Sequence, residues 1–350
     1  MDGHVSRLID LVPKDGSVFD IQELFFLLTI DSATHFLFGE SVGAMEDNTV
    51  LGKSSVGNAQ GFADAFNTAL EYLNKRSMSF SFYWAINPKK FRDANRRIHE
   101  VVDYYVHRAI EARRHPEKRE PGRYIFAESL AADNDDPKVL RDNMLNILLA
   151  GRDTTASLLS SVFFLLARNP AVWDKLRQVV VDEFGDVQNP KGAITHARLK
   201  DLPYLRYVLN EVLRLLPPVP LNFRIAVKDT TLPVGGGPDG KSPVFVKKGQ
   251  PVLYSIYAMH RRKDLYGPDA DAFRPERWEN AKRGWEYLPF NGGPRICLGQ
   301  QYALTEASYT IVRLMQRFST IENGEPGREF PIMRSNLTMS HGEGVAIRLY

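Results

Sequence analysis

The sequence predicts a mostly helical α+β fold with small β-sheets, arranged as a single domain over residues 1–350. Three observations lead to this prediction. Apolar residues recur at helical spacing through the first two thirds of the 350-residue chain. Short β-like runs separated by glycine and proline turns follow from about residue 217. The hydrophobic fraction of 43% is ample for a large core.

Composition excludes several classes of protein. Lys and Arg number 45 and Asp and Glu 42, a net charge of +3 that is too small to indicate nucleic acid as a partner. The single cysteine excludes an intramolecular disulfide framework and fits a reducing compartment. The first twenty residues are polar, unlike a signal peptide. The stretch 144–167 is interrupted by Arg152 and Asp153, which favours a buried helix over a membrane span.

The helices are predicted from apolar spacing and from capping residues. Asp20 is a candidate N-cap and Gly39 a candidate stop for the first, and Asp136 before Pro137 begins the longest. The aromatic-rich segment 77–84 is expected to pack in a corner between two helices, with the roof of an apolar pocket as the alternative. The predicted helices cover residues 20–39, 58–75, 88–114, 124–132, 137–167, 170–184 and 202–216.

Strands are predicted in the last third, at 223–227, 243–246 and 251–256, with a final hairpin at 336–349. The segment 235–242 fits the phosphate-loop pattern Gly-x4-Gly-Lys-Ser and also Gly-x-Gly-x-x-Gly. A phosphate loop leads from a strand into a helix that receives the phosphates, whereas a β-like run follows here. We therefore interpret this segment as a turn between two strands rather than as a nucleotide-binding site.

The segment 290–299 holds the only cysteine, Cys297, among glycines and a proline. These residues keep the backbone out of helix and let its N–H groups turn toward the sulfur. A helical pattern follows, and a helix N-terminus favours a thiolate. Arg295 is expected to point to the same side of an extended segment as Cys297, and Phe290 to pack beneath it. The pattern indicates a single-thiolate metal ligand rather than a small buried thiol, and zinc or iron–sulfur sites need more ligands.

A second polar group interrupts the long apolar helix at residues 150–155, Ala-Gly-Arg-Asp-Thr-Thr. A glycine, an acid and two hydroxyls are costly there, so we expect a functional reason. Gly151 would let another group approach the backbone, and a threonine hydroxyl that bonds back to a carbonyl would loosen the helix. Asp153 and Thr154 could relay protons. The alternative is a polar kink that faces water.

Both patterns resemble those of cytochrome P-450 monooxygenases. The spacing Phe-x-x-Gly-x-Arg-x-Cys-x-Gly is similar to the family's haem-thiolate loop, and residues 150–155 match (Ala/Gly)-Gly-x-(Asp/Glu)-Thr-Thr. The resemblance implies haem b with Cys297 as axial thiolate, and Asp153 and Thr154 as catalytic residues on the distal side. It implies insertion of one oxygen atom from dioxygen into a C–H bond of a hydrophobic substrate, with electrons from an NADPH-dependent reductase. The implied cofactor-binding residues are Phe290, Gly293, Arg295, Cys297, Gly299, Arg224 and Gly151.

Three further residues are assigned a structural role by the same resemblance. Glu211 and Arg214 stand one helical turn apart, and 273–278 resembles the family's Pro-Glu-Arg-(Phe/Trp) segment. The resemblance implies that Glu211, Arg214 and Arg277 form a buried charge network that supports the thiolate loop. Arg224 matches the position that contacts a haem propionate, and Arg295 would supply a second cation.

From about residue 20 the order of elements resembles a eukaryotic P-450, most closely the fungal alkane and fatty-acid hydroxylases. Such proteins begin with a membrane anchor, a first sheet and first helices, and we expect this chain to be incomplete in that part. The implied location is the endoplasmic reticulum membrane or, without an anchor, the cytoplasm. Two alternatives stay open: a truncated, inactive chain with weak or no haem binding, and an isomerase or peroxygenase, which the Asp153–Thr154 pair disfavours.

Overall fold

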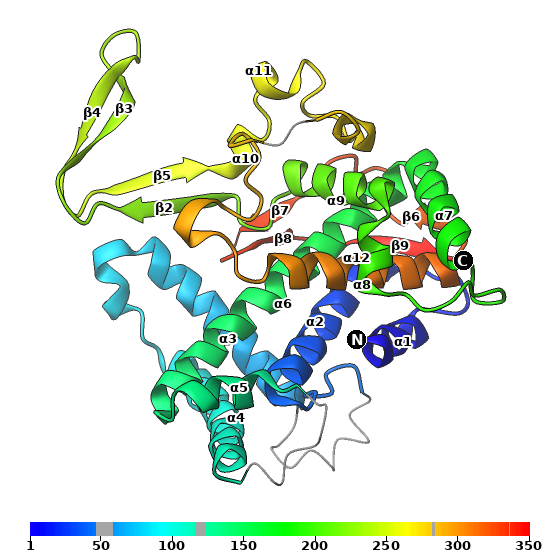
Figure 1. Cartoon of the computed structure of the whole chain (residues 1–350), viewed down its shortest axis with the longest axis horizontal. Coiled ribbons are helices and arrows are strands. Elements are labelled where there is room, and N and C mark those ends of the chain that lie inside the picture. The colour runs from blue at the N-terminus through cyan, green and yellow to red at the C-terminus, as the bar shows by residue number, and fades with distance from the viewer. Residues whose placement is uncertain (47–58, 116–123, 282–283, 336) are drawn as a thin grey trace.

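The long helix α6 (Pro137–Arg168) runs through the middle of the chain, and other helices surround it (Figure 1). The structure is a computed structural model that describes residues 1–46, 59–115, 124–281, 284–335 and 337–350. At the start of α6 the Asp136 carboxylate accepts the N–H groups of Lys138 (2.8 Å) and Val139 (3.4 Å). Pro137 occupies the first helical position, where no N–H is needed. This helix start is as the sequence predicts.

The helices agree with the predicted ranges to within a few residues. Asp20 accepts the Gln22 N–H (2.9 Å), and Gly39 ends the helix in the left-handed conformation (φ 78°). The short helices α1, α8, α10 and α11 were not predicted. The α-helices are α1 (Asp2–Leu11), α2 (Ile21–Phe38), α3 (Ala59–Met78), α4 (Lys89–Arg114), α5 (Phe126–Asp133), α6, α7 (Pro170–Phe184), α8 (His196–Lys200), α9 (Pro203–Leu215), α10 (Ile256–Met259), α11 (Lys263–Tyr266) and α12 (Gln300–Arg317), with 3-10 turns η2 (Phe80–Ala85), η4 (Pro275–Trp278) and η5 (Gly293–Arg295).

In the described part of the chain, the strands form four small antiparallel sheets. In the three-stranded sheet, β9 lies between β1 and β6; the others are the pairs β2–β5, β3–β4 and β7–β8. The predicted hairpin at 336–349 is therefore wrong, because β8 pairs with β7, and β9 pairs with strands far away in sequence; residue 336 lies outside the described residues. The strands are β1 (Phe19–Asp20), β2 (Leu221–Ile225), β3 (Thr230–Gly236), β4 (Ser242–Val246), β5 (Pro251–Ser255), β6 (Ile321–Asn323), β7 (Met333–Ser335), β8 (Met339–His341) and β9 (Ala346–Leu349).

Two hydrophobic cores meet along α6. One core packs the second half of α6 against α1, α7, α9 and α12, and begins on α6 at Ala156. The other packs the first half of α6 against α3, α4 and α5, and its buried residues on α6 end at Leu148. The polar segment 150–155 lies between these two points, so it occupies the seam where the two cores adjoin. Its glycine and polar side chains therefore displace few core contacts.

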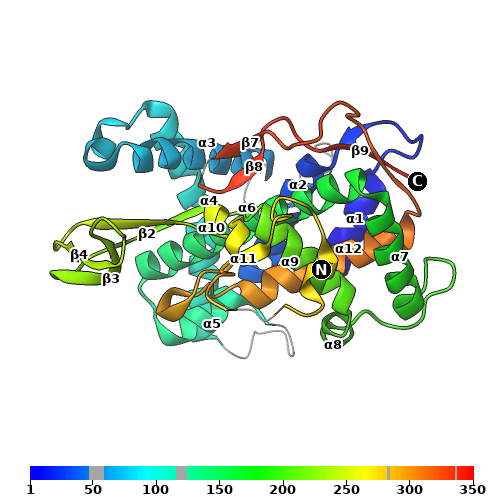
Figure 2. The same cartoon turned by 90° about the horizontal axis from the view of Figure 1, so that it is seen from above.

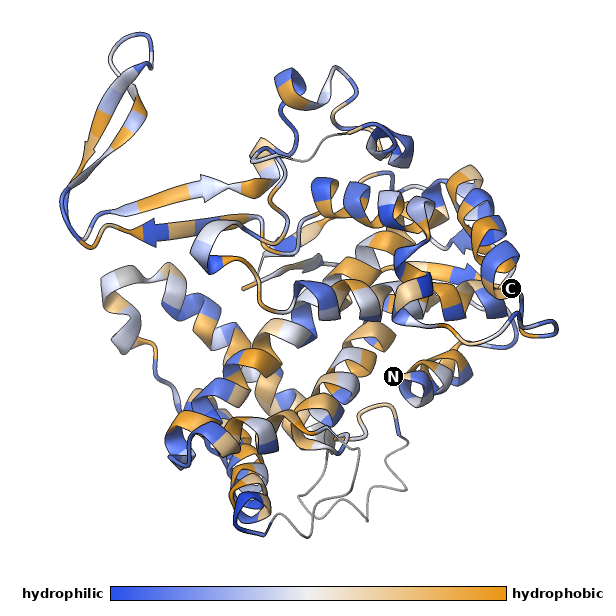
Figure 3. Ribbon diagram, in the orientation of Figure 1, coloured by the Kyte–Doolittle hydropathy of each residue, from blue (hydrophilic) through white to orange (hydrophobic). Residues whose placement is uncertain are grey.

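The pairs β2–β5 and β3–β4 project from the helical body in both views (Figures 1 and 2). The glycine-rich segment 235–242 is the turn of the β3–β4 hairpin, as the sequence analysis predicts, and Gly237 and Gly240 have positive φ (75° and 68°). On β2, the alternate apolar residues Leu221, Phe223 and Ile225 are each more than half exposed, and residues two apart in a strand point to the same face. Figure 3 shows that apolar residues also occur in the strands that project from the helical body.

The aromatic connection between α3 and α4 differs from expectation. Residues 80–85 form the turn η2, and Phe82, Tyr83 and Trp84 are 70%, 51% and 66% exposed. They do not pack in a helix corner. The reason is geometric: a 3-10 turn has about three residues per turn, so three consecutive rings point in three directions and cannot share one buried face.

No single described helix is long and apolar enough to cross a membrane. Helices α6 and α7 reach the required length and apolarity only together, and they meet at a bend of 114°.

Candidate active site

The loop around Cys297 presents the only thiol of the chain at the surface, immediately before α12. The Cys297 side chain is exposed, and its backbone N–H donates to the Phe290 carbonyl (2.9 Å), which closes the loop. Phe290 is partly buried and packs against the core that contains α12. The helix begins three residues after the cysteine, at Gln300. The thiol therefore lies near a helix N-terminus on an anchored loop, where negative charge is favoured.

The backbone before Cys297 is not extended, contrary to the sequence-based expectation for Arg295. Residues Gly293–Arg295 form the 3-10 turn η5, with Gly293 at φ 69°. Pro294 fixes a helical φ inside this turn, so the alternation of an extended chain does not apply. Arg295 is exposed, and the prediction that it lies on an extended segment with Cys297 is wrong.

The polar segment of α6 remains helical throughout. The Thr154 hydroxyl donates to the Ala150 carbonyl one turn earlier (2.7 Å), the back-bond considered from the sequence. The helix is not broken at this point, because α6 runs without interruption from Pro137 to Arg168. A Cβ atom added to Gly151 would meet no atom within 4 Å outside its own helix. Gly151 thus leaves this part of the α6 surface accessible to another group.

Arg152 and Asp153 form a nearly buried ion pair at the seam between the two cores. Arg152 Nη1 donates to Asp153 Oδ1 (3.0 Å), and the guanidinium lies near the rings of Phe26 (5.3 Å) and Phe66 (5.5 Å). Burial raises the pKa of the Asp153 carboxyl above its ordinary value, and Arg152 opposes this only in part. The carboxyl of Asp153 can therefore hold a proton at a higher pH than the carboxyl of a surface aspartate.

A cavity of about 480 Å³ adjoins this ion pair. Both Arg152 and Asp153 line it, together with residues of α3 and of the β7–β8 pair, among them Glu71, Lys75 and Arg334. Glu71 and Lys75 are about half exposed and pair with each other. The cavity therefore joins the buried carboxyl of Asp153 to charged groups at the surface.

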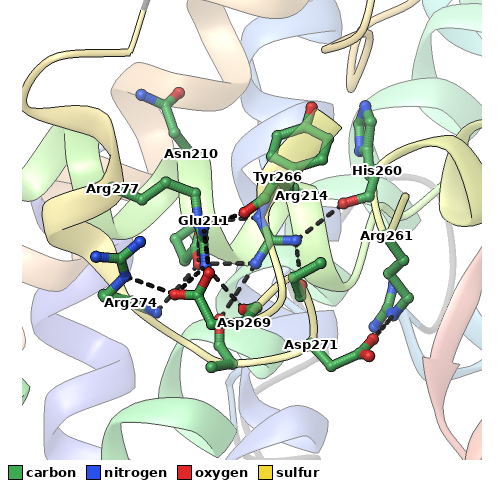
Figure 4. Close-up of polar contacts among 12 residues, drawn as sticks. Asn210, Glu211, Arg214, His260, Arg261, Tyr266, Asp269, Asp271, Arg274 and Arg277 are labelled. Atoms are coloured by element: carbon green, nitrogen blue, oxygen red, sulfur yellow. Dashed lines mark hydrogen bonds and ion pairs between the residues drawn. The ribbon is translucent and has the colours of Figure 1, made fainter. Parts of the chain in front are cut away.

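Glu211, Arg214 and Arg277 come together in one network (Figure 4). Arg214 binds Glu211 through two bonds, Nε to Oε2 (2.9 Å) and Nη2 to Oε1 (2.8 Å), and both side chains are fully buried. Arg277 Nε reaches Glu211 Oε1 at 3.3 Å, and its Nη groups bind Asp269. Every charge in the cluster thus has an opposite partner, as a buried ion cluster requires.

The network extends beyond the three predicted residues. The Trp278 indole donates to Glu211 Oε2 (2.9 Å), and the backbone N–H of Arg274 donates to Oε1 (3.1 Å). Burial lowers the pKa of Arg277, but the carboxylates of Asp269 and Glu211 outweigh it and hold its pKa above the ordinary value. Asp269 in turn has a lowered pKa because it accepts bonds from Arg277.

Arg224 lies on the exposed strand β2. Its Nη1 donates to the Phe223 carbonyl (2.8 Å) and to Asn222 Oδ1 (3.3 Å), and its guanidinium lies over the Tyr254 ring (5.6 Å). The Tyr254 hydroxyl donates to Asn291 Oδ1 (3.0 Å) in the cysteine loop. This bond links the strands that carry Arg224 to the loop that carries Cys297.

The α+β fold and the comparison with known proteins define the class of protein: this is a haem-thiolate monooxygenase. The cytochrome P450 family model matches residues 2–341, and the chain belongs to this family. The fold class, the monooxygenase activity and a haem b cofactor bound by a cysteine thiolate, all predicted from the sequence, are thereby confirmed.

The chain is similar to several yeast proteins over its whole length. It is 50% identical over 360 residues to cytochrome P450 52A12 of Debaryomyces hansenii, a match that covers 100% of this chain and 69% of the relative. It is 51% identical over 356 residues to cytochrome P450 52A3-A of Candida maltosa (99% and 68%). It is 47% identical over 363 residues to cytochrome P450 52A6 of Candida tropicalis (99% and 69%). Members of this family take electrons from a reductase and bind hydrophobic substrates.

The residues present fit a haem. The thiol of Cys297 is exposed between Ile296 and Leu298, which are 55% and 93% exposed, so a flat apolar group would cover apolar side chains there. A Cβ atom added to Gly293 or Gly299 would meet no atom within 4 Å, as at Gly151. The cations Arg224 and Arg295 are both exposed, as groups that bind propionates need to be.

Sequence reasoning missed three participants: Arg152, Trp278 and His260. The sequence analysis assigns Arg152 no partner, although its place next to an acid inside a buried helix signals an ion pair. Trp278 stands inside the segment 273–278, but the sequence does not show which group accepts its N–H. His260 accepts the Leu288 N–H and binds Arg214 through its carbonyl. No sequence signal reveals these contacts, because the partners lie far apart in the chain.

Proposed function

We propose that this chain hydroxylates an aliphatic C–H bond of an alkane or a fatty acid, with Cys297 as the axial ligand of the haem iron. One observation carries the proposal: the single thiol of the chain is exposed on an anchored loop directly before α12. The substrate class is supported by the resemblance of residues 223–278 to fungal alkane and fatty-acid hydroxylases. The similar proteins of Debaryomyces hansenii and Candida maltosa share the designation cytochrome P450 52A.

When bound, the haem supplies the redox chemistry that activates dioxygen, and the thiolate of Cys297 donates electron density that favours cleavage of the O–O bond. Arg224 and Arg295 would hold the carboxylates of the haem by charge-assisted hydrogen bonds. Gly151 and Gly293 keep the surfaces near the ring free of side chains. Phe290 and Gly299 hold the shape of the loop.

Asp153 and Thr154 deliver protons during the reaction. The Asp153 carboxyl has a raised pKa and lines the cavity that reaches surface charges, so it can take up protons from solvent at its Oδ atoms. The Thr154 hydroxyl donates to the Ala150 carbonyl, which leaves its oxygen free to accept a second hydrogen bond on the distal side. Arg152 holds the Asp153 carboxylate in one orientation between proton transfers.

Glu211, Arg214 and Arg277 support the thiolate loop without touching substrate. Their network ties α9 to η4, the segment that precedes the loop, and all three side chains are buried. Removal of one buried partner would leave another charge unpaired, so the network resists any change that separates α9 from η4.

Electrons come from an NADPH-dependent reductase, and the enzyme acts at the endoplasmic reticulum membrane. Cell fractionation tests this location.

The first test is spectroscopic. The purified chain, reconstituted with haem and reduced under carbon monoxide, is expected to show the long-wavelength Soret band of thiolate ligation. Cys297→Ser is expected to lose this band while it keeps the far-ultraviolet circular dichroism of the parent. Absence of the band from the parent chain would instead support a truncated, inactive protein.

The second test addresses proton delivery with a matched pair of variants. Thr154→Ala is expected to lower product formed per NADPH by about tenfold or more, because the hydroxyl acts in proton transfer. Thr155→Ala is the control, since Thr155 is the next residue of the same helix and points into the buried core, 1% exposed. Equal losses in the two variants would contradict the role of Thr154.

A third test addresses the substrate. Alkanes and fatty acids of graded chain length identify the substrate by the haem spin-state change they cause.

A further inference from the structure

His260 is a fully buried histidine that the proposed reaction does not use. It directly follows α10 and is 0% exposed. Its Nε2 accepts the backbone N–H of Leu288 (2.9 Å), and its own carbonyl accepts Arg214 Nη1 (2.9 Å). Figure 4 shows the bond between His260 and Arg214 of the buried charge network. Through Leu288, His260 also joins that network to the segment that leads into the cysteine loop.

Three successive residues of that segment are held by side-chain bonds. The Tyr266 hydroxyl donates to the Glu286 carbonyl (2.8 Å). The Tyr287 hydroxyl donates to the Asn210 carbonyl (3.1 Å). His260 takes the third bond, to Leu288. Two residues later the Phe290 carbonyl accepts the Cys297 N–H, so residues 286–288 fix the end of the loop on which the thiol depends.

The ring chemistry of His260 suits this task. Nε2 can accept a bond only in the neutral imidazole, and burial lowers the pKa of His260 to about 4, against the opposing effect of backbone carbonyls at Arg214 and Leu213. At neutral pH the ring is therefore a constant acceptor. It also stacks on the Tyr287 ring at 5.2 Å and 29°. The backbone carbonyls of Arg214 and Leu213 interact with the ring, and Nε2 accepts the bond from Leu288.

We propose that His260 is a positioning residue for the thiolate ligand: by accepting the Leu288 N–H it fixes the segment 286–290 and thereby the place of Cys297 beneath the haem. The inference rests on the proposed haem-thiolate function. It assigns to His260 a role that the Glu211 network alone does not fill, because that network bonds to the backbone of His260 and not to the cysteine loop.

Two substitutions separate the acceptor from the ring. His260→Gln can place an oxygen near the position of Nε2 and keep the bond to Leu288. His260→Phe keeps a ring against Tyr287 but leaves the Leu288 N–H without an acceptor. His341 provides a matched control, because it is also buried (4% exposed), also bonds through Nε2 (Ser161 Oγ, 3.1 Å) and belongs to β8, away from the cysteine loop.

The first measurement needs no haem. Amide hydrogen exchange at Leu288 in the haem-free chain is expected to be about tenfold faster in His260→Phe than in the parent, since the lost bond protected that N–H. His260→Gln and His341→Phe are expected to exchange at the parent rate. Unchanged exchange in His260→Phe would overturn the inference.

The second measurement reports the thiolate itself. In the haem-loaded protein reduced under carbon monoxide, His260→Phe is expected to raise the ratio of short- to long-wavelength Soret absorbance about tenfold. His260→Gln should restore the parent spectrum, and His341→Phe should match it. If His260→Phe keeps the parent spectrum, a positioning role is refuted even where exchange has changed. A parent chain without the long-wavelength band overturns the proposed function, and this inference with it.

Discussion

Glu306 is a carboxyl group buried in the middle of α12, the helix that follows the cysteine loop. It is 1% exposed and accepts a short hydrogen bond from the Ser32 hydroxyl of α2. Burial raises its pKa to about 7, from an ordinary value of 4.5; the Ser32 bond and the amino-terminal charge of Met1 oppose the rise. The phenol of Tyr302 is the other titratable group that faces it. Replacement of Glu306 by glutamine therefore removes a charge that the fold accommodates poorly.

The size and sign of the effect follow from this pKa. When the pKa of a carboxyl is higher in the folded than in the unfolded chain, the free energy of unfolding is larger at low pH than at high pH. This extra stability is lost as pH rises from about 4.5 to about 7. The difference between the two pKa values corresponds to about 3 kcal/mol, since one pKa unit is worth about 1.4 kcal/mol. Glu306→Gln keeps the shape of the side chain without the ionisation. We compare the free energy of unfolding of the variant with that of the parent at each pH. The value for the variant minus that for the parent is expected to be up to about 3 kcal/mol larger at pH 8 than at pH 5.

Urea unfolding of both haem-free proteins at pH 5 and pH 8, followed by circular dichroism, measures this double difference. Glu71→Gln serves as the control, because Glu71 is an exposed carboxylate paired with Lys75 on α3. A double difference near zero for Glu306→Gln would refute the reasoning. It would show that the carboxyl finds enough polar partners to ionise normally.

Three further predictions concern the core and the helix that carries the proton relay. Glu211→Gln is expected to lower the free energy of unfolding by about 3–5 kcal/mol in urea titrations, since Arg214 loses its buried counter-charge. The control is Glu276→Gln at an exposed position, which should cost less than about 1 kcal/mol. Equal costs in the two variants would contradict burial as the cause. Leu148→Ala, in the core on one side of the seam, should cost about 2–5 kcal/mol in the same assay, and a loss below about 1 kcal/mol would contradict its close packing. Gly151→Ala should raise stability by about 0.5–1 kcal/mol in the haem-free chain while it lowers product formed per NADPH, because the helix gains alanine and the surface near the haem gains a methyl group; lost stability would contradict the open space at this position.

The helices and the motifs could be predicted from the sequence because they depend on residues close together in the chain. Asp136 caps α6 through N–H groups two and three residues away, and Gly39 ends α2 by its own conformation. The phosphate-loop pattern at 235–242 could be rejected because the segment that follows is a strand. The cysteine and acid–threonine motifs indicated the family by their resemblance to its motifs, because each is a short pattern of fixed residue types.

Other features required the tertiary structure because they depend on distant contacts. The partners of β9 are β1 and β6, and the nearer β8 pairs elsewhere, which alternation along one segment cannot reveal. Phe82 and Trp84 are exposed because they lie on a 3-10 turn, in which consecutive side chains point in different directions and cannot share one buried face. The direction of Arg295 was mispredicted, because a three-residue 3-10 turn replaced the extended segment.

What the sequence by itself determined is the chemistry: one thiol in a glycine-rich loop, one acid beside a hydroxyl in a long helix, and a Glu–Arg–Arg set. These follow from residue type and short spacing. What only the tertiary structure decided is the environment of each group, such as the seam between two cores that buries Arg152 and Asp153, and the meeting of His260 with Leu288. Burial and pairing set pKa values and positions, and both arise from segments that only folding brings together.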